Sequence, residues 1–209
     1  MVRRMYIKRK RRAPTWRDWV KNPRLCEQSL HYFERREQVK RLNVRQARDD
    51  ILGHLRKAFH NISFANQIFD SSQKGVFQVN YAGESFYDWV ITICYYAMYQ
   101  ASLAALAAVR KEGENHSATM CTLIYHYVHR KKRLHEQYLF SLDTIKSLAD
   151  QDIQKLADKR LEREKASYDT GFTTQVGIAQ TALSDAREFV LKIREILEEG
   201  VGRDFLKDV

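Results

Sequence analysis

The distribution of proline does most to limit what this chain can fold into. Both prolines, Pro14 and Pro23, lie near the N-terminus, and residues 24–209 contain none. Proline breaks helices because it lacks a backbone N–H and its ring clashes with the preceding turn, so this long segment favours helices. Glycines along it predict the loops between helices. The glycines that mark these predicted loops are Gly75, Gly83, Gly113, Gly171, Gly200 and Gly202.

The spacing of apolar residues predicts where the main helices lie. In residues 44–69 and 174–197, apolar side chains recur every three or four positions, as on one buried face of a helix. Residues 86–111 are apolar almost all round, which is typical of a helix at the centre of a bundle. This segment is also long enough to cross a membrane, but Asp88, Gln100 and four tyrosines favour the buried position.

Shorter helices are expected between and before these segments. Residues 117–130 follow the possible caps Asn115 and Ser117, and further helices are expected over 135–148 and 150–168. Residues 30–46 are expected to be helical and to continue into the next helix. The fold class is therefore predicted to be all-α, a bundle of about five helices. The predicted organisation is an N-terminal extension over 1–43, the bundle over 44–199 and a C-terminal tail over 200–209.

The positive charge is concentrated in the first quarter of the chain. The whole chain has a net charge of +10, whereas residues 1–48 alone hold 16 Lys and Arg against 4 Asp and Glu. The other residues hold 20 basic and 22 acidic side chains, which is nearly balanced. A polyanion such as RNA or DNA would therefore meet this protein first at its N-terminal end.

Aromatic residues lie among the basic residues of this N-terminal end. Residues 1–25 hold ten Lys and Arg together with Tyr6, Trp16 and Trp19. Cations suit phosphate contacts and aromatic rings suit base stacking, so this pattern indicates RNA binding. A solvated tail, or a tail whose tryptophans fold back onto the bundle, are the alternatives. The nucleic-acid-binding candidates here are Arg3, Arg4, Lys8, Arg9, Lys10, Arg11, Arg12, Trp16 and Arg17.

A second basic segment, HRKKRLH, occupies residues 129–135. Its cations Arg130, Lys131, Lys132 and Arg133 follow a predicted helix, where they can stabilise the helix dipole or bind phosphate. Arg130 and His135 also have four residues between them, a spacing used by some helical ribonucleases. Four arginine–histidine pairs of similar spacing occur in the chain, a weak excess over the about two that chance would give. The spacing alone therefore does not identify an active site.

The sequence lacks the common signatures of enzymes, metal sites and secreted proteins. It has no Gly-rich phosphate loop, HExxH or GxSxG sequence, so no metal or cofactor is expected. Its three cysteines form no CxxC pair and no secretory signal precedes them, which predicts free thiols and a cytoplasmic location.

Several segments, in order, resemble the HEPN family of prokaryotic helical domains, and archaeal members in particular. They are QARDDILGHLRKAFHNISFANQIFD, YDWVITICYYAMYQASLAAL, NHSATMCTLIYHYV, REKASYD and AREFVLKIREIL, within residues 44–198. The resemblance implies a HEPN-like helical bundle, a homodimer, and a family-motif site at Tyr96, His116, Arg163 and Tyr168.

The resemblance implies two branches of function. Many HEPN domains are metal-independent endoribonucleases, often toxins, with an Arg-x4-6-His sequence on a late helix. Others bind nucleotides or nucleic acids, frequently beside a minimal nucleotidyltransferase. Here no histidine follows Arg163, and Gln100 and Ser167 stand where the family pattern usually has histidine and aspartate. These departures count against acid/base catalysis, for which the remaining candidates are His116, His135, Arg130 and Arg163.

The expected function is therefore a non-catalytic HEPN-type module that binds ribosomal or other structured RNA through its basic N-terminal arm and residues 130–133. One alternative is a HEPN endoribonuclease toxin. Another is a HEPN partner of a nucleotidyltransferase or PIN protein in a toxin–antitoxin system. A homodimer with no membrane association is expected in each case.

Overall fold

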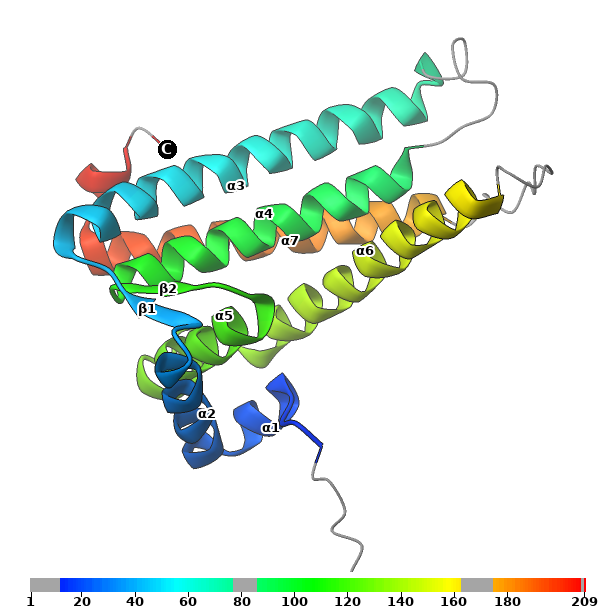
Figure 1. The fold of residues 1–209 in the computed structure, drawn as a ribbon. Coiled ribbons are helices and arrows are strands. Elements are labelled where there is room, and N and C mark those ends of the chain that lie inside the picture. Colours follow the sequence, from blue (N-terminus) through cyan, green and yellow to red (C-terminus); the bar gives the residue numbers. More distant parts are fainter. Residues whose placement is uncertain (1–11, 77–85, 163–174, 208) are drawn as a thin grey trace, which may run out of the picture.

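The chain folds as an all-α helical bundle with very little sheet, as predicted (Figure 1). The structure is a computed structural model that describes residues 12–76, 86–162, 175–207 and 209. Within these residues it describes the backbone throughout and the side chains everywhere except at 152–162 and 175. The α-helices in this part of the chain are α1 (Trp16–Lys21), α2 (Pro23–Arg35), α3 (Val44–Gln73), α4 (Tyr87–Ala108), α5 (His116–Leu123), α6 (Glu136–Glu162) and α7 (Gln175–Val201). The remaining elements are the strands β1 (Val39–Arg41) and β2 (Lys111–Gly113), the π-helix η2 (Ile124–Arg130) and the 3-10 helix η3 (Arg203–Leu206).

Helix α4 is the central helix of the bundle, as its apolar sequence predicted. It packs against α3, α6 and α7, and Figure 1 shows it running between α3 and α6. Cys94, Ala97, Met98 and Ala101 along its length are completely buried. Of the described helices, α4 alone has the length and apolarity that a membrane span would need. Its contacts with three neighbouring helices account for that apolarity within the bundle.

Helix α3 forms because its sequence combines a good cap with one continuous apolar stripe. The Asn43 side chain accepts a hydrogen bond from the Gln46 backbone N–H at 2.9 Å, and the Gln46 side chain in turn accepts one from the Asn43 N–H. This capping box satisfies two backbone donors at the helix start. The predicted stripe is buried against the bundle. Its buried residues are Ala47, Ile51, Leu55, Ala58, Ile62 and Ala65.

A small antiparallel sheet replaces helix at two predicted places. The helix expected over 86–111 ends at Ala108, because Lys111–Gly113 pair with Val39–Arg41. The expectation that residues 30–46 continue as helix into α3 is also wrong. Helix α2 ends at Arg35, and Glu37 then takes a positive φ of 58°, which turns the chain into β1. Backbone pairing between distant segments has overridden local helix preference here.

The two helices expected over 135–148 and 150–168 form one continuous helix, α6, through Glu162. No proline or glycine separates them, and Lys146 forms an ion pair with Asp150 across the predicted break. Residues 163–168, and the predicted cap Thr174 of the last helix, lie outside the described residues.

The segment before α3 packs onto the same core as the bundle. Trp19 is only 4% exposed, and its indole N–H donates to the Ser29 hydroxyl at 2.9 Å. Cys26 on α2 contacts Cys121 on α5, with 4.0 Å between the two Sγ atoms. All three cysteines are buried free thiols, as predicted. Trp19 therefore folds back onto the bundle, which was one of the alternatives for the N-terminal end.

Candidate nucleic-acid interface

A hydrogen bond brings the two basic segments of the sequence together. The His129 ring nitrogen Nε2 lies 3.0 Å from the backbone carbonyl oxygen of Trp19, 110 residues away in sequence. Because a carbonyl oxygen only accepts, Nε2 carries the proton in this contact. His129 lies in the last turn of the π-helix, next to residues 130–133, and Trp19 lies on α1. The basic patch 130–133 therefore lies beside the helix into which the N-terminal arm leads.

Three cations of this patch carry no acidic partner in the described part of the chain. The Arg130 guanidinium donates to the Tyr125 hydroxyl at 3.2 Å and lies over that ring. Lys131 places its ammonium 4.8 Å from the centre of the Tyr127 ring, and partial burial lowers the pKa of Lys131. Lys132 is exposed, with a positive φ of 53°. These cations could bind phosphate without first breaking an ion pair.

Arg133 differs from the other three because it is already neutralised. Its guanidinium lies 3.1 Å from the Glu199 carboxylate at the end of α7. Leu134, the next residue, is buried and fixes the turn between η2 and α6. Arg133 therefore holds this turn against α7, and a phosphate would have to compete with Glu199 for it.

The N-terminal candidates are described only from Arg12 onward. Arg12 forms a 3.5 Å ion pair with Asp18, and Arg17 lies 3.9 Å from Asp143 on α6. The Arg17 guanidinium also stacks over the Trp16 ring, 4.6 Å from its centre. The candidates outside the described residues are Arg3, Arg4, Lys8, Arg9, Lys10 and Arg11.

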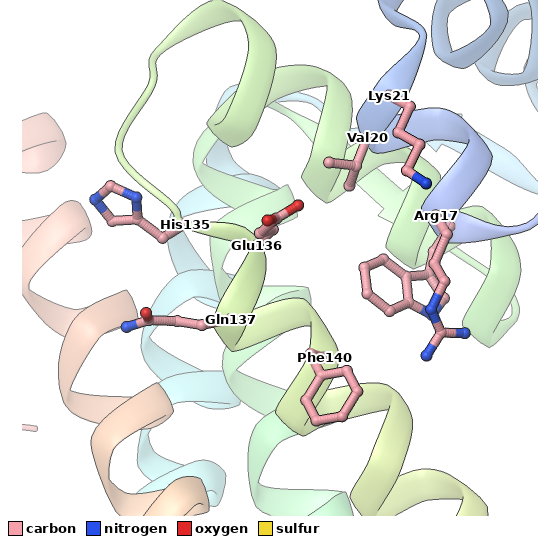
Figure 2. A pocket seen from close by; sticks show the side chains of 8 residues that line it. Arg17, Val20, Lys21, His135, Glu136, Gln137 and Phe140 are labelled. Atoms are coloured by element: carbon pink, nitrogen blue, oxygen red, sulfur yellow. The ribbon is translucent and has the colours of Figure 1, made fainter.

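An open groove of about 580 Å³ lies between α1 and the first turns of α6 (Figure 2). Figure 2 shows Arg17, Val20 and Lys21 on the α1 side and His135, Glu136, Gln137 and Phe140 on the α6 side; Trp16 also lines the groove. The Glu136 carboxylate turns towards Val20, whereas the His135 ring points away from α1. The groove therefore combines aromatic, cationic and hydrogen-bonding side chains from two sequence-distant segments.

The sequence predicted three residues of this groove and missed the others. Trp16, Arg17 and His135 were candidates, but Lys21, Gln137 and Phe140 were not. A signal for Phe140 was present, because it lies off the stripe of buried positions Leu139 and Leu142 on its helix. An aromatic residue outside the apolar stripe of a helix is exposed, so core packing does not explain its presence and a binding role becomes a candidate.

The structure does not bring Arg130 and His135 together as an acid/base pair. No hydrogen bond between them occurs in the described residues, since the Arg130 guanidinium donates to the Tyr125 hydroxyl and His135 is exposed. A ribonuclease would need the arginine and the imidazole to face the same phosphate. The arrangement of these two residues does not favour that chemistry.

His116, the other histidine candidate, lies at the first position of α5 in a partly buried aromatic cluster. Its Nδ1 is 3.5 Å from the Tyr95 hydroxyl, and its ring stacks near Tyr99. Burial lowers the pKa of His116 to about 4, with Lys146 as a smaller cause, so the ring is neutral at pH 7. Tyr96 is exposed and contacts Tyr95, while Arg163 and Tyr168 lie outside the described residues.

Gln100, at the position where the resemblance to HEPN domains implied a histidine, has a defined structural role. Its side-chain oxygen accepts a hydrogen bond from the His54 ring nitrogen Nδ1 at 2.7 Å, joining α3 to α4. His54 was not a candidate, because a single polar residue beside an apolar stripe gives little signal in the sequence. The pair satisfies two polar groups at a half-buried position.

Neither a metal site nor a known relative was found. Among the side chains that the structure describes, within 12–76, 86–151 and 176–207, no three His, Cys, Asp or Glu residues gather as metal ligands would. Comparisons with protein-family models, with curated proteins and with solved structures gave no match.

Proposed function

We propose that this chain is a non-catalytic HEPN-type module that binds structured RNA. The observation that carries the proposal is the docking of α1 beside the basic patch through His129 and Trp19. It brings the cations of α1 close to those of residues 130–133, which are far apart from them in sequence. The segments that resemble the HEPN family support the family assignment.

The exposed cations of this surface suit the RNA backbone. Lys21, Arg24 and Lys132 are exposed and form no ion pair among the described residues, and the Arg130 and Lys131 side chains contact tyrosines rather than carboxylates. Residues 1–11 add six more Lys and Arg. Contacts between cations and the backbone recognise the positions of the phosphates and the shape of a folded RNA, and not its base sequence.

Fluorescence anisotropy with a labelled RNA hairpin, measured at several salt concentrations, tests the proposal. The full chain should bind with a steep salt dependence, because each phosphate contact adds about 0.9 to the slope of log K against log salt. Deleting residues 1–11 should weaken binding most, and Lys131→Gln with Lys132→Gln should lower the slope by about 1–2. Arg56→Gln with Lys57→Gln, exposed on α3, removes the same charge elsewhere and should change little.

Recovered RNA should be run on a denaturing gel after the binding measurement. Intact RNA agrees with a binding module. Fragmented RNA would contradict it and would favour an endoribonuclease, with His116 and His135 as the first residues to replace. Binding that does not depend on salt or on residues 1–11 would also contradict the proposed surface.

A protein contact is a second candidate function, favoured by the exposed aromatic side chains of α4. Trp89 and Tyr96 lie two turns apart on this otherwise buried helix and are both about half exposed. This face could hold a second copy of the chain, as expected for the family, or a nucleotidyltransferase or PIN protein. Light scattering on wild type and Trp89→Ala tests the homodimer: a dimer that the variant weakens supports it, and a monomeric wild type contradicts it.

A further inference from the structure

The groove between α1 and α6 has features that backbone binding does not require. Phe140 is 54% exposed and Trp16 is half-buried, and both line the groove. No ring contact between these two side chains occurs in the described part of the chain, so they present aromatic surface to the same open space. Base–aromatic stacking is the usual way in which proteins hold single-stranded nucleic acid.

The size and charge of the groove suit one nucleotide. Its volume of about 580 Å³ is within the usual range for small-ligand sites. Arg17 and Lys21 are four residues apart, one helical turn, and both line it from α1 (Figure 2). Arg17 is held by a long 3.9 Å contact with Asp143 and by stacking over the Trp16 ring, and Lys21 forms no ion pair among the described residues. Both cations can therefore turn to a phosphate at the edge of the groove.

The α6 side of the groove offers a hydrogen-bond acceptor instead. Glu136 places an exposed carboxylate there, whereas the Gln137 amide points away from α1 (Figure 2). A carboxylate repels phosphate but accepts hydrogen bonds from the amino group of adenine, cytosine or guanine. This division of charge would orient a nucleotide with its phosphate towards α1 and its base towards α6. Uracil, which has no amino group, would gain less.

From these features we propose that the groove is a subsite for one unpaired, amino-bearing base of the RNA. The inference rests on the proposed RNA-binding function and adds a preference to it. Structured RNA would be bound where a base is free to leave the stack, in a loop, a bulge or a single-stranded end. The basic surface would supply the affinity for the backbone, and the groove would select the unpaired position.

The test compares oligoadenylate and oligouridylate of about 12 nucleotides with a duplex of equal length, using the full chain. Phe140→Ala should weaken oligoadenylate binding about tenfold, a typical loss for one stacked base. It should leave duplex binding and the salt slope unchanged. Phe64→Ala, which removes a 47% exposed phenyl ring from α3, is the matched control and should have no effect. Glu136→Gln should reduce the preference for oligoadenylate over oligouridylate.

The outcomes separate this inference from the proposed function. If the duplex binds with a steep salt slope but Phe140→Ala behaves like Phe64→Ala, the subsite is wrong and the RNA-binding function stands. If oligouridylate binds as well as oligoadenylate, the role of Glu136 is wrong. If no RNA binds at all, both proposals fail. Because Phe140 is exposed, its replacement should leave the thermal melting curve unchanged, which confirms that the variant is folded.

Discussion

At the scale of single residues, Gly113 has the most restricted surroundings among the described glycines. A Cβ atom there would clash with the Thr119 hydroxyl oxygen and would lie 3.1 Å from the Thr119 Cα atom. Thr119 is buried in α5, so it has little room to move. Strand β2 can therefore pass against α5 only because residue 113 has no side chain.

Gly113→Ala should lower the free energy of unfolding by about 1–3 kcal/mol, the usual cost of adding a methyl group to a well-packed site. Gly53→Ala is the control, because Gly53 lies in the middle of α3 and a methyl group added there would have no atom within 4 Å. That change should raise the free energy by about 0.5–1 kcal/mol. Urea unfolding measures both. A neutral Gly113→Ala would contradict the close approach of β2 to α5.

His116 should make the stability of the protein depend on pH. Its pKa is about 4 in the folded chain and near 6.5 in the unfolded chain, so the unfolded chain takes up the proton first as the pH falls. The contribution of the neutral His116 ring to the free energy of unfolding is complete above pH 6.5 and is lost progressively as the pH falls from 6.5 to 4.

Urea unfolding between pH 7 and 4 measures this dependence. His116→Gln should make the curve flatter in that window, by up to about 1 kcal/mol per pH unit. His60→Gln, which replaces an exposed histidine on α3, should leave the curve parallel to that of the wild type. A His116→Gln curve parallel to the wild type would mean that the ring is not buried in solution.

The individual residues of the groove were easier to predict from the sequence than the fact that the fold brings them together. The mixture of cations and aromatics singled out Trp16 and Arg17, and the HRKKRLH segment singled out His135. Their common groove was not predictable, because the contact that docks α1 is made by the backbone carbonyl of Trp19. Every residue has a backbone carbonyl, so the sequence carries no sign of the His129 partner.

At the scale of secondary-structure elements, the start of α3 depends on Asn43. Replacing it with alanine removes the side-chain acceptor for the Gln46 N–H and should lower the free energy of unfolding by about 1 kcal/mol. Asn43→Ser keeps an acceptor and should retain most of the stability. Thermal melting of both variants measures the difference, and equal losses would show that the cap does not stabilise the helix.

The long helices were predictable because each repeats its apolar pattern over many residues. The apolar stripe of α3 and the all-round apolarity of α4 were each sufficient to predict a helix. Helix α7 also lies where its apolar stripe predicted a helix. The strands were not predictable, because three residues are too few to show an alternating pattern. The pairing partner of β1 also lies far along the chain. Absence of proline permits helix but does not require it, which explains why helix was wrongly predicted between α2 and α3, over residues 36–43.

At the scale of the whole molecule, residues 16–42 belong to the packed core. Deleting residues 1–42 would expose the surfaces that Trp19, Leu30 and Val39 cover, and a buried apolar side chain contributes about 1.5–3 kcal/mol. That variant should lose several kcal/mol and melt at a much lower temperature. Deleting residues 1–11 leaves every described helix and strand in the chain and should keep the melting temperature.

Differential scanning calorimetry of the two truncated chains makes this comparison. The result also decides how the RNA affinities of the truncated chains are interpreted. A lower affinity indicates lost phosphate contacts only if the truncated chain is still folded. If deletion of residues 1–42 left the melting temperature unchanged, α1 and α2 would not be part of the core in solution.

The pairing of β1 with β2 has a consequence for the order of folding. Lys40 and Glu114, an ion pair across this ribbon, are 74 residues apart, so the ribbon closes a large loop. Loops of this size close slowly unless local contacts shorten them, and the α3–α4 hairpin is the local structure that does so. We expect the hairpin to form first and the ribbon afterwards. Helices α1 and α2 pack on α5 and η2, and their contact between Cys26 and Cys121 joins residues 95 positions apart. We therefore expect the surface proposed to bind RNA to form after the hairpin as well.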